Sequence, residues 1–272
     1  MQQGAIDTEN AKFWNELCGS TLARLLGITD ASPESLRRYD AAYLAFYPYL
    51  QRYVERERLH NKRVLEIGPG YGTLGQLLAS AGCDYHGLDI SEAPVAMMRH
   101  RLIALGLTNV EQRVLIGSAL EIPHADASFA YVYAIGCLHH TGNLNKAVSE
   151  VYRVLVPGGK AIVMVYHRHS LFQLVRGSTV RLQALLSRGR IDAARQIRSL
   201  YDSNQRGEAA PHTDFVSLPE ARRLFKDFMR VKIDMRNFGN IGMKGKILIP
   251  RELLLNNVAR VLGLDLYITA CK

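Results

Sequence analysis

The stretch VLEIGPGYGTLG, from Val64 to Gly75, governs the expected fold and allows two interpretations of its ligand. A short apolar run typical of a buried strand enters a glycine-rich turn, and a helical pattern follows. The segment GYGTLG matches the G-x-G-x-x-G pattern of dinucleotide-binding folds. The overlapping segment EIGPGYG instead places an acid before glycines at every second position. Glycines let the backbone approach a nucleotide in both cases, so glycine content alone does not separate them.

Strand-like and helix-like patterns alternate around this turn. Helical patterns separate most of the strands, and PGG at 157–159 turns the chain into the fifth one. Strands are expected at residues 63–67, 84–90, 110–117, 128–136, 160–167, 229–238 and 265–272. This spacing predicts an α/β fold with a doubly wound, seven-stranded, mostly parallel sheet and helices on both of its faces.

The pattern on either side of the alternating region predicts four parts. They are a helical N-terminal segment or lid at 1–58, a cofactor-binding core at 59–168, a helical basic lid insertion at 169–216 and a completion of the sheet at 217–272. Helix starts are expected at Ser32, Ser91 and Ser217, because a serine hydroxyl can cap free backbone N–H groups. Pro33 suits the first helical position after Ser32.

The N-terminal part carries aromatic side chains at helical spacing. Phe13, Trp14 and Leu17 share one expected helical face. The helix after Ser32 and its continuation carry Tyr39, Tyr43, Phe46, Tyr47 and Tyr53. We expect most of these rings to pack against the core, and the alternative is a lid over a bound cofactor.

The net charge of +9 is concentrated in the last two-fifths of the chain. From Lys160 onward, 20 lysines and arginines stand against 9 acids, whereas 14 stand against 16 before it. A solvated surface is the simplest interpretation, and the alternatives are an anionic acceptor, an acidic carrier, a lipid surface or nucleic acid. The arginines of the 169–216 segment are interleaved with leucines and isoleucines, so we expect an amphipathic basic region there. They are Arg176, Arg181, Arg188, Arg190, Arg195, Arg198 and Arg206.

Cysteine spacing and hydropathy bear on the compartment. Four cysteines, Cys18, Cys83, Cys137 and Cys271, lie far apart without a C-x-x-C pair, which disfavours a disulfide framework and a zinc site. The N-terminal sequence MQQGAIDTEN is polar, and no run approaches the roughly 18 apolar residues that span a bilayer. We therefore expect a cytoplasmic protein without a bound metal.

The acid before the glycines favours one of the two ligand interpretations. If Gly70 begins a dinucleotide motif, Gly68 and Pro69 lengthen the turn without a reason. Glu66 ends the first strand, where a carboxylate would repel a diphosphate but attract a cationic sulfonium–amino acid ligand. Asp89 ends the second strand, and its two oxygens suit the hydroxyls of a ribose in either case.

Several motifs then occur in order: VLEIGPGYG, GLDIS, and the run from Gly117 to Arg168 that contains GSALEIPHADASFAYVYAIGCLHHTGNL and VLVPGGKAIVMVYHR. From about Lys62 to Arg168 the chain resembles the class I S-adenosylmethionine-dependent methyltransferases. The nearest branch is the one that includes ubiquinone, menaquinone and natural-product methyltransferases. The resemblance implies a Rossmann-like methyltransferase fold with a late antiparallel strand, S-adenosylmethionine as cofactor, and methyl transfer to a small-molecule acceptor.

The resemblance also implies roles for single residues. The methionine part of the cofactor would be held by Glu66, Gly68, Gly70 and Gly72. Its ribose and adenine would be held by Asp89, Ile90, Ser118 and Ala119, and the sulfonium side would be lined by Ala134 and its neighbours. Two positions depart from the family pattern: Ser118 stands where an aspartate is expected, and Ala130 stands where an aspartate is frequent.

Histidines follow two strands at the expected ligand-binding edge. His139 and His140 follow the fourth strand, and His167 ends the fifth. An amine acceptor needs little beyond alignment, whereas a hydroxyl or an acidic C–H needs a base, and histidine titrates near neutral pH. These three are the catalytic candidates, and the alternative for each is a capping or packing role. His212 and Asp214 are weaker candidates for substrate contact.

Other functions are open at this stage. The basic C-terminal part would suit an RNA methyltransferase, but no RNA-binding module and no N-P-P-Y-type tetrapeptide accompany it. A nicotinamide-dependent oxidoreductase would use GYGTLG but leaves Glu66 unexplained, and a non-catalytic relative would not need Asp89. We therefore expect a small-molecule acceptor and no stable nucleic-acid partner, and a homodimer stays open.

Overall fold

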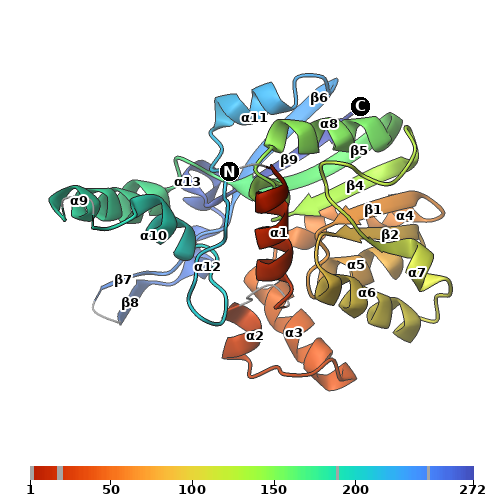
Figure 1. Cartoon of the computed structure of the whole chain (residues 1–272), viewed down its shortest axis with the longest axis horizontal. Helices are drawn as coiled ribbons and strands as arrows, with labels where there is room; N and C mark the ends of the chain where they lie inside the picture. Colours follow the sequence, from red (N-terminus) through yellow and green to blue (C-terminus); the bar gives the residue numbers. More distant parts are fainter. Residues whose placement is uncertain (1–2, 17–20, 188–189, 244–245) are drawn as a thin grey trace.

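The computed structural model describes residues 3–16, 21–187, 190–243 and 246–272. Its centre is a seven-stranded sheet in the order β3-β2-β1-β4-β5-β9-β6, in which β9 runs antiparallel to both of its neighbours (Figure 1). The strands are β1 (Arg63–Ile67), β2 (Asp84–Asp89), β3 (Val114–Ile116), β4 (Phe129–Ile135), β5 (Leu155–Tyr166), β6 (Arg230–Arg236) and β9 (Asp265–Cys271). The prediction of a seven-stranded, mostly parallel α/β sheet is confirmed. Leu17, Cys18 and Arg188 lie outside the described residues.

Two hydrophobic clusters lie on the two faces of this sheet. One joins Val132 and Val163 to helices α8 (Leu144–Val154) and α11 (Leu218–Leu224). The other joins Val64 and Tyr133 to the helices on the opposite face, α4 (Arg56–Leu59), α5 (Thr73–Ala79) and α6 (Glu92–Ala104). Alternate side chains of the central strands are therefore buried on both faces, as a doubly wound sheet requires.

The N-terminal helices lie beside the sheet at its carboxyl edge (Figure 1). They are α1 (Gln3–Trp14), α2 (Thr21–Leu25) and α3 (Pro33–Phe46), and the short helix η1 (Leu50–Tyr53) follows them. The expected cap is confirmed: Ser32 accepts a hydrogen bond from the backbone N–H of Ser35, and Pro33 takes the first helical position.

The segment after β5 extends away from the sheet together with a small hairpin (Figure 1). It contains a single π-turn η3 (Gln173–Gly177), α9 (Ser178–Leu186) and α10 (Ala193–Ser199), and the hairpin pairs β7 (Ile241–Met243) with β8 (Lys246–Ile249). The helices α12 (Arg251–Leu254) and α13 (Ala259–Leu262) lead into β9. Ser217 caps α11 in a reciprocal capping box with Glu220, which confirms the helix start expected there.

Two local expectations differ from the structure. The strand expected at 110–117 is shorter, because α7 (Val110–Arg113) precedes β3. The side chain of Arg99 donates to the carbonyls of Glu111 and Val114 and so stabilises this turn. Ser91 precedes α6 without capping it through its hydroxyl, which instead donates to the carbonyl of Ala11.

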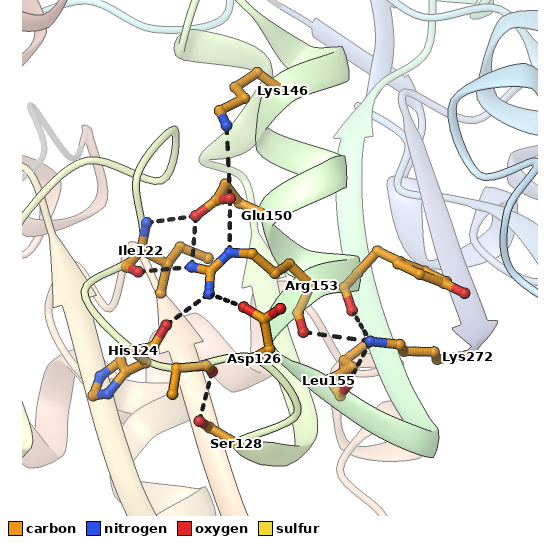
Figure 2. Close-up of polar contacts among 11 residues, drawn as sticks. Ile122, His124, Asp126, Ser128, Lys146, Glu150, Arg153, Leu155 and Lys272 are labelled. Carbon is orange, nitrogen blue, oxygen red and sulfur yellow. Dashed lines mark hydrogen bonds and ion pairs between the residues drawn. The ribbon is translucent and has the colours of Figure 1, made fainter.

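A dense polar network fastens the amino edge of the sheet (Figure 2). Arg153, at the end of α8, donates to the carboxylate of Glu150, to Asp126 and to the carbonyls of Ile122 and His124. Glu150 also accepts from the backbone N–H of Ile122. This network ties α8 to the loop that leads into β4.

Within the described ranges, no helix combines the length and the apolar character that crossing a bilayer requires.

Candidate functional site

A pocket opens where the loops after β1, β2, β3 and β4 meet at the carboxyl edge of the sheet. The strand order reverses between β1 and β4, and in doubly wound sheets ligands bind beside such a reversal. The pocket wall includes residues at or just after the ends of four strands: Gly68 and Gly70 after β1, Asp89 and Ile90 at the end of β2, Ser118 and Ala119 after β3, and Ile135, Gly136 and Cys137 at the end of β4. The motif residues of the sequence therefore converge on one cavity.

The glycine turn has the backbone that only glycine adopts readily. Gly68, Gly70 and Gly72 have φ angles of 72°, 56° and 76°. A Cβ atom on Gly68 would lie 2.6 Å from the Cβ of Cys137, because the two loops touch beneath the pocket. Gly72 does not line the pocket; a Cβ there would meet the side chain of Arg101 at 2.7 Å. Gly68 and Gly70 thus shape the cavity, and Gly72 allows α5 to start against α6.

Glu66 lines the pocket from beneath α5 and is only 2% exposed. The hydroxyl of Tyr85 donates to its Oε2 at 2.5 Å. Burial raises the pKa of this carboxyl to about 7, so near neutral pH it is only partly ionised. Its attraction for a cationic ligand is therefore weaker than the sequence argument assumed.

Asp89 lies at the end of β2 and receives the backbone N–H of Ser91 at 2.9 Å. Burial raises its pKa to about 6, below neutrality, so the carboxylate stays largely ionised at pH 7. Ile90, Ser118 and Ala119 lie along the same wall of the pocket. The hydroxyl oxygen of Ser118 accepts a hydrogen bond from the N–H of Leu120.

Ala134 lies apart from the other expected cofactor residues. Its side chain is fully buried in the core cluster on the face that α8 covers. The next residues along β4, Ile135 and Gly136, reach the pocket in its place together with Cys137. Successive strand residues point to opposite faces, so a one-residue shift decides which of them meets the cavity.

Of the three candidate histidines, His140 alone lines the pocket. Its Nδ1–H donates to the carbonyl of His212 at 2.8 Å, and its Nε2 lies 3.6 Å from Oδ2 of Asp202. Burial lowers the pKa of the imidazole, which keeps it neutral at physiological pH.

The other two histidines are buried away from the pocket. His139 is fully buried with its ring 4.2 Å from that of Tyr166, and burial holds its pKa well below the usual value. His167 donates from Nδ1 to the carbonyl of Gly263 at 3.0 Å, and burial lowers its pKa as well. Both contacts correspond to the packing alternative for these residues.

His212 and Asp214 support this wall without lining the pocket. Their side chains pair at 3.1 Å, the carbonyl of His212 accepts the His140 proton, and the N–H of Asp214 donates to the carbonyl of His139. They hold the histidine loop from behind.

The N-terminal helices contribute five residues to the pocket wall, which agrees with the lid alternative for their aromatic rings. Trp14 of α1 packs its ring 4.8 Å from that of His140, and Asn10 donates to the His140 carbonyl at 2.7 Å. Tyr39 of α3 stacks on Tyr71 of the glycine turn at 4.1 Å. These helices bring to the wall Asp7, Asn10, Trp14, Tyr39 and Tyr43. The helical run of tyrosines was the available signal, but we assigned most of it to the core.

The charges of the pocket are of one sign. Three carboxylates line it, Asp7, Glu66 and Asp89, and no lysine or arginine of the described chain does so. A diphosphate would find no counter-charge here, whereas a ligand with a sulfonium and an ammonium would find several. The described part of the chain also contains no group of three or more histidines, cysteines and acids arranged to hold a metal.

Comparison with known proteins agrees with this geometry. Residues 65–163, which carry β1 to β5 and most of the pocket, match a family model described as a methyltransferase domain. Over these residues the chain is similar to the class I S-adenosylmethionine-dependent methyltransferases. The donor in this family is S-adenosylmethionine, and the cradle of glycines and carboxylates suits it.

Proteins similar to this chain include two bacterial proteins named ubiquinone biosynthesis O-methyltransferase. The Pseudomonas fluorescens protein is 31% identical over 149 residues, and the Pseudomonas aeruginosa protein is 32% identical over 148. Each match covers 53% of this chain and 62% of the relative, so the chain spans about three-fifths of the curated relatives' length.

Solved structures share the fold at lower identity. An S-adenosylmethionine-dependent methyltransferase from Archaeoglobus fulgidus is 16% identical with a TM-score of 0.52, covering 86% of this chain and 99% of that one. One from Aquifex aeolicus is 13% identical with a TM-score of 0.50, covering 88% and 98%. At these identities the likeness concerns the fold alone.

Proposed function

We propose that this chain transfers a methyl group from S-adenosylmethionine to a small-molecule acceptor. The observation that carries the proposal is the pocket at the strand reversal, where a glycine turn and three carboxylates stand without a lysine or arginine of the described chain. The names of the ubiquinone-pathway relatives support a small-molecule acceptor and a reaction at oxygen.

In this proposal, different pocket residues bind different parts of the cofactor. Glu66, Gly68 and Gly70 would hold the methionine part, and Asp89 would accept hydrogen bonds from the ribose hydroxyls. The adenine would lie along Ile90, Ser118 and Ala119. Gly72 and Ala134 do not line the pocket and would support the residues that do. S-adenosylmethionine, when bound, supplies a methyl group made electrophilic by its positively charged sulfur.

The acceptor side is the wall formed by Trp14, Tyr43 and His140. The carbonyl of His212 fixes the proton of His140 on Nδ1, which leaves Nε2 as the basic nitrogen. Asp202, 3.6 Å from that nitrogen, would stabilise the imidazolium that forms when the base takes a proton from a hydroxyl. Replacing His140 with alanine is expected to lower turnover about 10²- to 10⁴-fold without weakening cofactor binding. His167→Ala is the control and should retain its turnover. An equal loss of turnover in both variants would contradict the assignment of His140 as the base.

The described arginines of the 169–216 segment do not enter this proposal. Arg176, Arg190, Arg195 and Arg206 are exposed to solvent, and none lines the pocket. The lining therefore gives no counter-charge to an anionic acceptor, and the basic segment serves best as a solvated surface.

Titration calorimetry with S-adenosylhomocysteine and with NAD on the purified chain tests the proposal. The charge of the pocket predicts binding of the former and no measurable binding of the latter. Binding of NAD alone would overturn the proposal, and a methyl-labelled donor with a panel of phenols, amines and acids would then be expected to label nothing.

A further inference from the structure

A second group of acidic and aromatic side chains lies behind the acceptor wall, at the carboxyl ends of β5 and the start of β9. We call it the Asp202–Asp265 cluster. It consists of Asp202, Asp265, Tyr47, Tyr49, Tyr166 and Tyr201.

The two carboxylates of this cluster flank one tyrosine. Asp265 is the strand partner of Tyr166 across the antiparallel pair β5 and β9, so their side chains share a face of the sheet. The hydroxyl of Tyr166 donates to Oδ1 of Asp202 at 3.1 Å. The ring of Tyr201 lies 4.7 Å from that of Tyr166 and extends the aromatic surface.

Several polar atoms of the cluster lack a hydrogen bond of normal geometry within the described chain. Asp265 is 1% exposed, and neither of its carboxylate oxygens accepts a hydrogen bond of normal geometry there, although the side chain of Asn237 lies near enough to lower its pKa. The hydroxyl of Tyr49 and Oδ2 of Asp202 also lack a hydrogen bond, and Oδ2 faces Nε2 of His140 at 3.6 Å. Burial raises the pKa of Asp265 to about 7. Buried polar groups without hydrogen bonds cost free energy, so their presence points to a functional role such as ligand binding.

The nearest permanent cation is committed elsewhere. Arg251 acts on Asp265 only at a distance, because its guanidinium donates to Asn237 and to the carbonyls of Phe238 and Phe46. Among the residues that the structure describes, no lysine or arginine forms an ion pair with either aspartate of the cluster. Asp265 is therefore only partly ionised near neutral pH, and a cation bound beside it would favour its ionised form.

The cluster adjoins the pocket at two points. His140 lines the pocket and faces Asp202 across 3.6 Å. Tyr43 lines the pocket, and its ring lies 4.9 Å from the ring of Tyr47. The cluster residues do not line the pocket themselves, so a ligand group would reach them only by passing His140 or Tyr43.

We propose that the Asp202–Asp265 cluster binds a cationic nitrogen carried by the methyl acceptor. This inference rests on the proposed function. It concerns the charge of the acceptor and does not depend on which of its atoms is methylated. Aromatic faces attract an ammonium group, and two desolvated carboxylates supply its counter-charge. A neutral acceptor would leave Asp265 unpaired, and an anionic one would be repelled.

Three probes on one scaffold test the proposal: phenethylamine, phenethyl alcohol and hydrocinnamate. Each is titrated by calorimetry into the chain saturated with S-adenosylhomocysteine. We expect the amine to bind roughly tenfold or more tighter than the alcohol, and the carboxylate not to bind. Asp265→Asn should reduce the amine to the affinity of the alcohol. The same change at Asp84, at the opposite edge of the sheet, should leave the preference intact.

The failure of this inference is distinguishable from failure of the proposed function. If S-adenosylhomocysteine binds but the amine binds no tighter than the alcohol, or no probe binds at all, the cluster does not bind a cation. If S-adenosylhomocysteine itself does not bind, the proposed function fails first. Should thermal unfolding show that Asp265→Asn does not fold, Asp202→Asn takes its place, and an undiminished amine preference there would overturn the proposal.

Discussion

Buried carboxylates lie at both edges of the sheet, but they are fully paired at the amino edge and largely unpaired at the carboxyl edge. At the amino edge, Glu150 and Arg153 satisfy one another and the neighbouring backbone (Figure 2). At the carboxyl edge, Glu66 has one tyrosine partner, and Asp265 accepts no hydrogen bond of normal geometry from the described residues. The hydrogen bonds from Arg153 lower the pKa of Glu150, whereas burial raises that of Glu66 to about 7.

In our proposal, this difference separates residues that stabilise the fold from residues that bind a ligand. A buried carboxylate with a cation and two or three donors stabilises the folded state. A buried carboxylate without them costs free energy, which a bound ligand can recover. Charge pairing, rather than the presence of charge, thus marks the functional edge of this sheet.

The largest expected effect is on the carboxyl edge, at Asp89. Asp89→Ala removes the acceptor for two ribose hydroxyls, each worth about 1.5–3 kcal/mol when the partner is charged. Calorimetry should therefore show the affinity for S-adenosylhomocysteine reduced by roughly 100-fold or more. Asp84→Ala, at the other end of the same strand, is the matched control and should bind as the parent does. An unchanged affinity in Asp89→Ala would show that the ribose lies elsewhere.

The opposite pattern is expected at Glu150. Glu150→Ala leaves the guanidinium of Arg153 and the N–H of Ile122 without their partner, so the free energy of unfolding should fall by about 2 kcal/mol. Urea denaturation measures this loss. The affinity for S-adenosylhomocysteine should not change, and a parallel loss of binding would contradict the division between the two edges.

A smaller effect should appear in the pH dependence of stability. The pKa of Glu66 is raised from 4.5 to about 7 in the folded chain, so the folded state binds this proton more tightly than the unfolded state. Its contribution is fully present below pH 4.5 and is lost as the pH rises through 7. The slope contributed by one such group is at most about 1.4 kcal/mol per pH unit.

Glu66→Gln keeps the shape of the side chain and removes its titration. Urea denaturation at several pH values should show a shallower decline for this variant between the two pKa values, with stability gained at neutral pH. Parallel curves for the variant and the parent would mean that Glu66 is ionised in the folded chain.

The core of the fold was accessible from the sequence because its signals are local. Apolar runs between turns predicted the parallel strands, and the glycine turn predicted where a ligand would approach. The strand expected from residue 110 began too early, because the side chain of Arg99 stabilises a turn of helix there from outside the segment. Such a contact leaves no mark in the local pattern.

Some residues of the site could likewise be predicted from local motifs, and others could not. Residues of the motif loops, such as Gly68, Asp89 and Ser118, could be named in advance because the sheet carries them to one edge. Asn10 and Trp14 could not, because their place depends on contacts with His140 that join residues far apart in the chain. Asp265 was missed since a single acid at the start of a strand has no distinguishing context.

The position of β9 has a consequence for how the chain folds. This strand follows β6 in the chain yet inserts between β5 and β6, so β5 must wait about a hundred residues for its neighbour. Pairings of such high contact order form late, and a partly synthesised chain on the ribosome would expose an open strand edge. Since β9 brings Asp265, the glycine turn and the acceptor wall are synthesised before the carboxylate that we propose binds the cationic group of the acceptor.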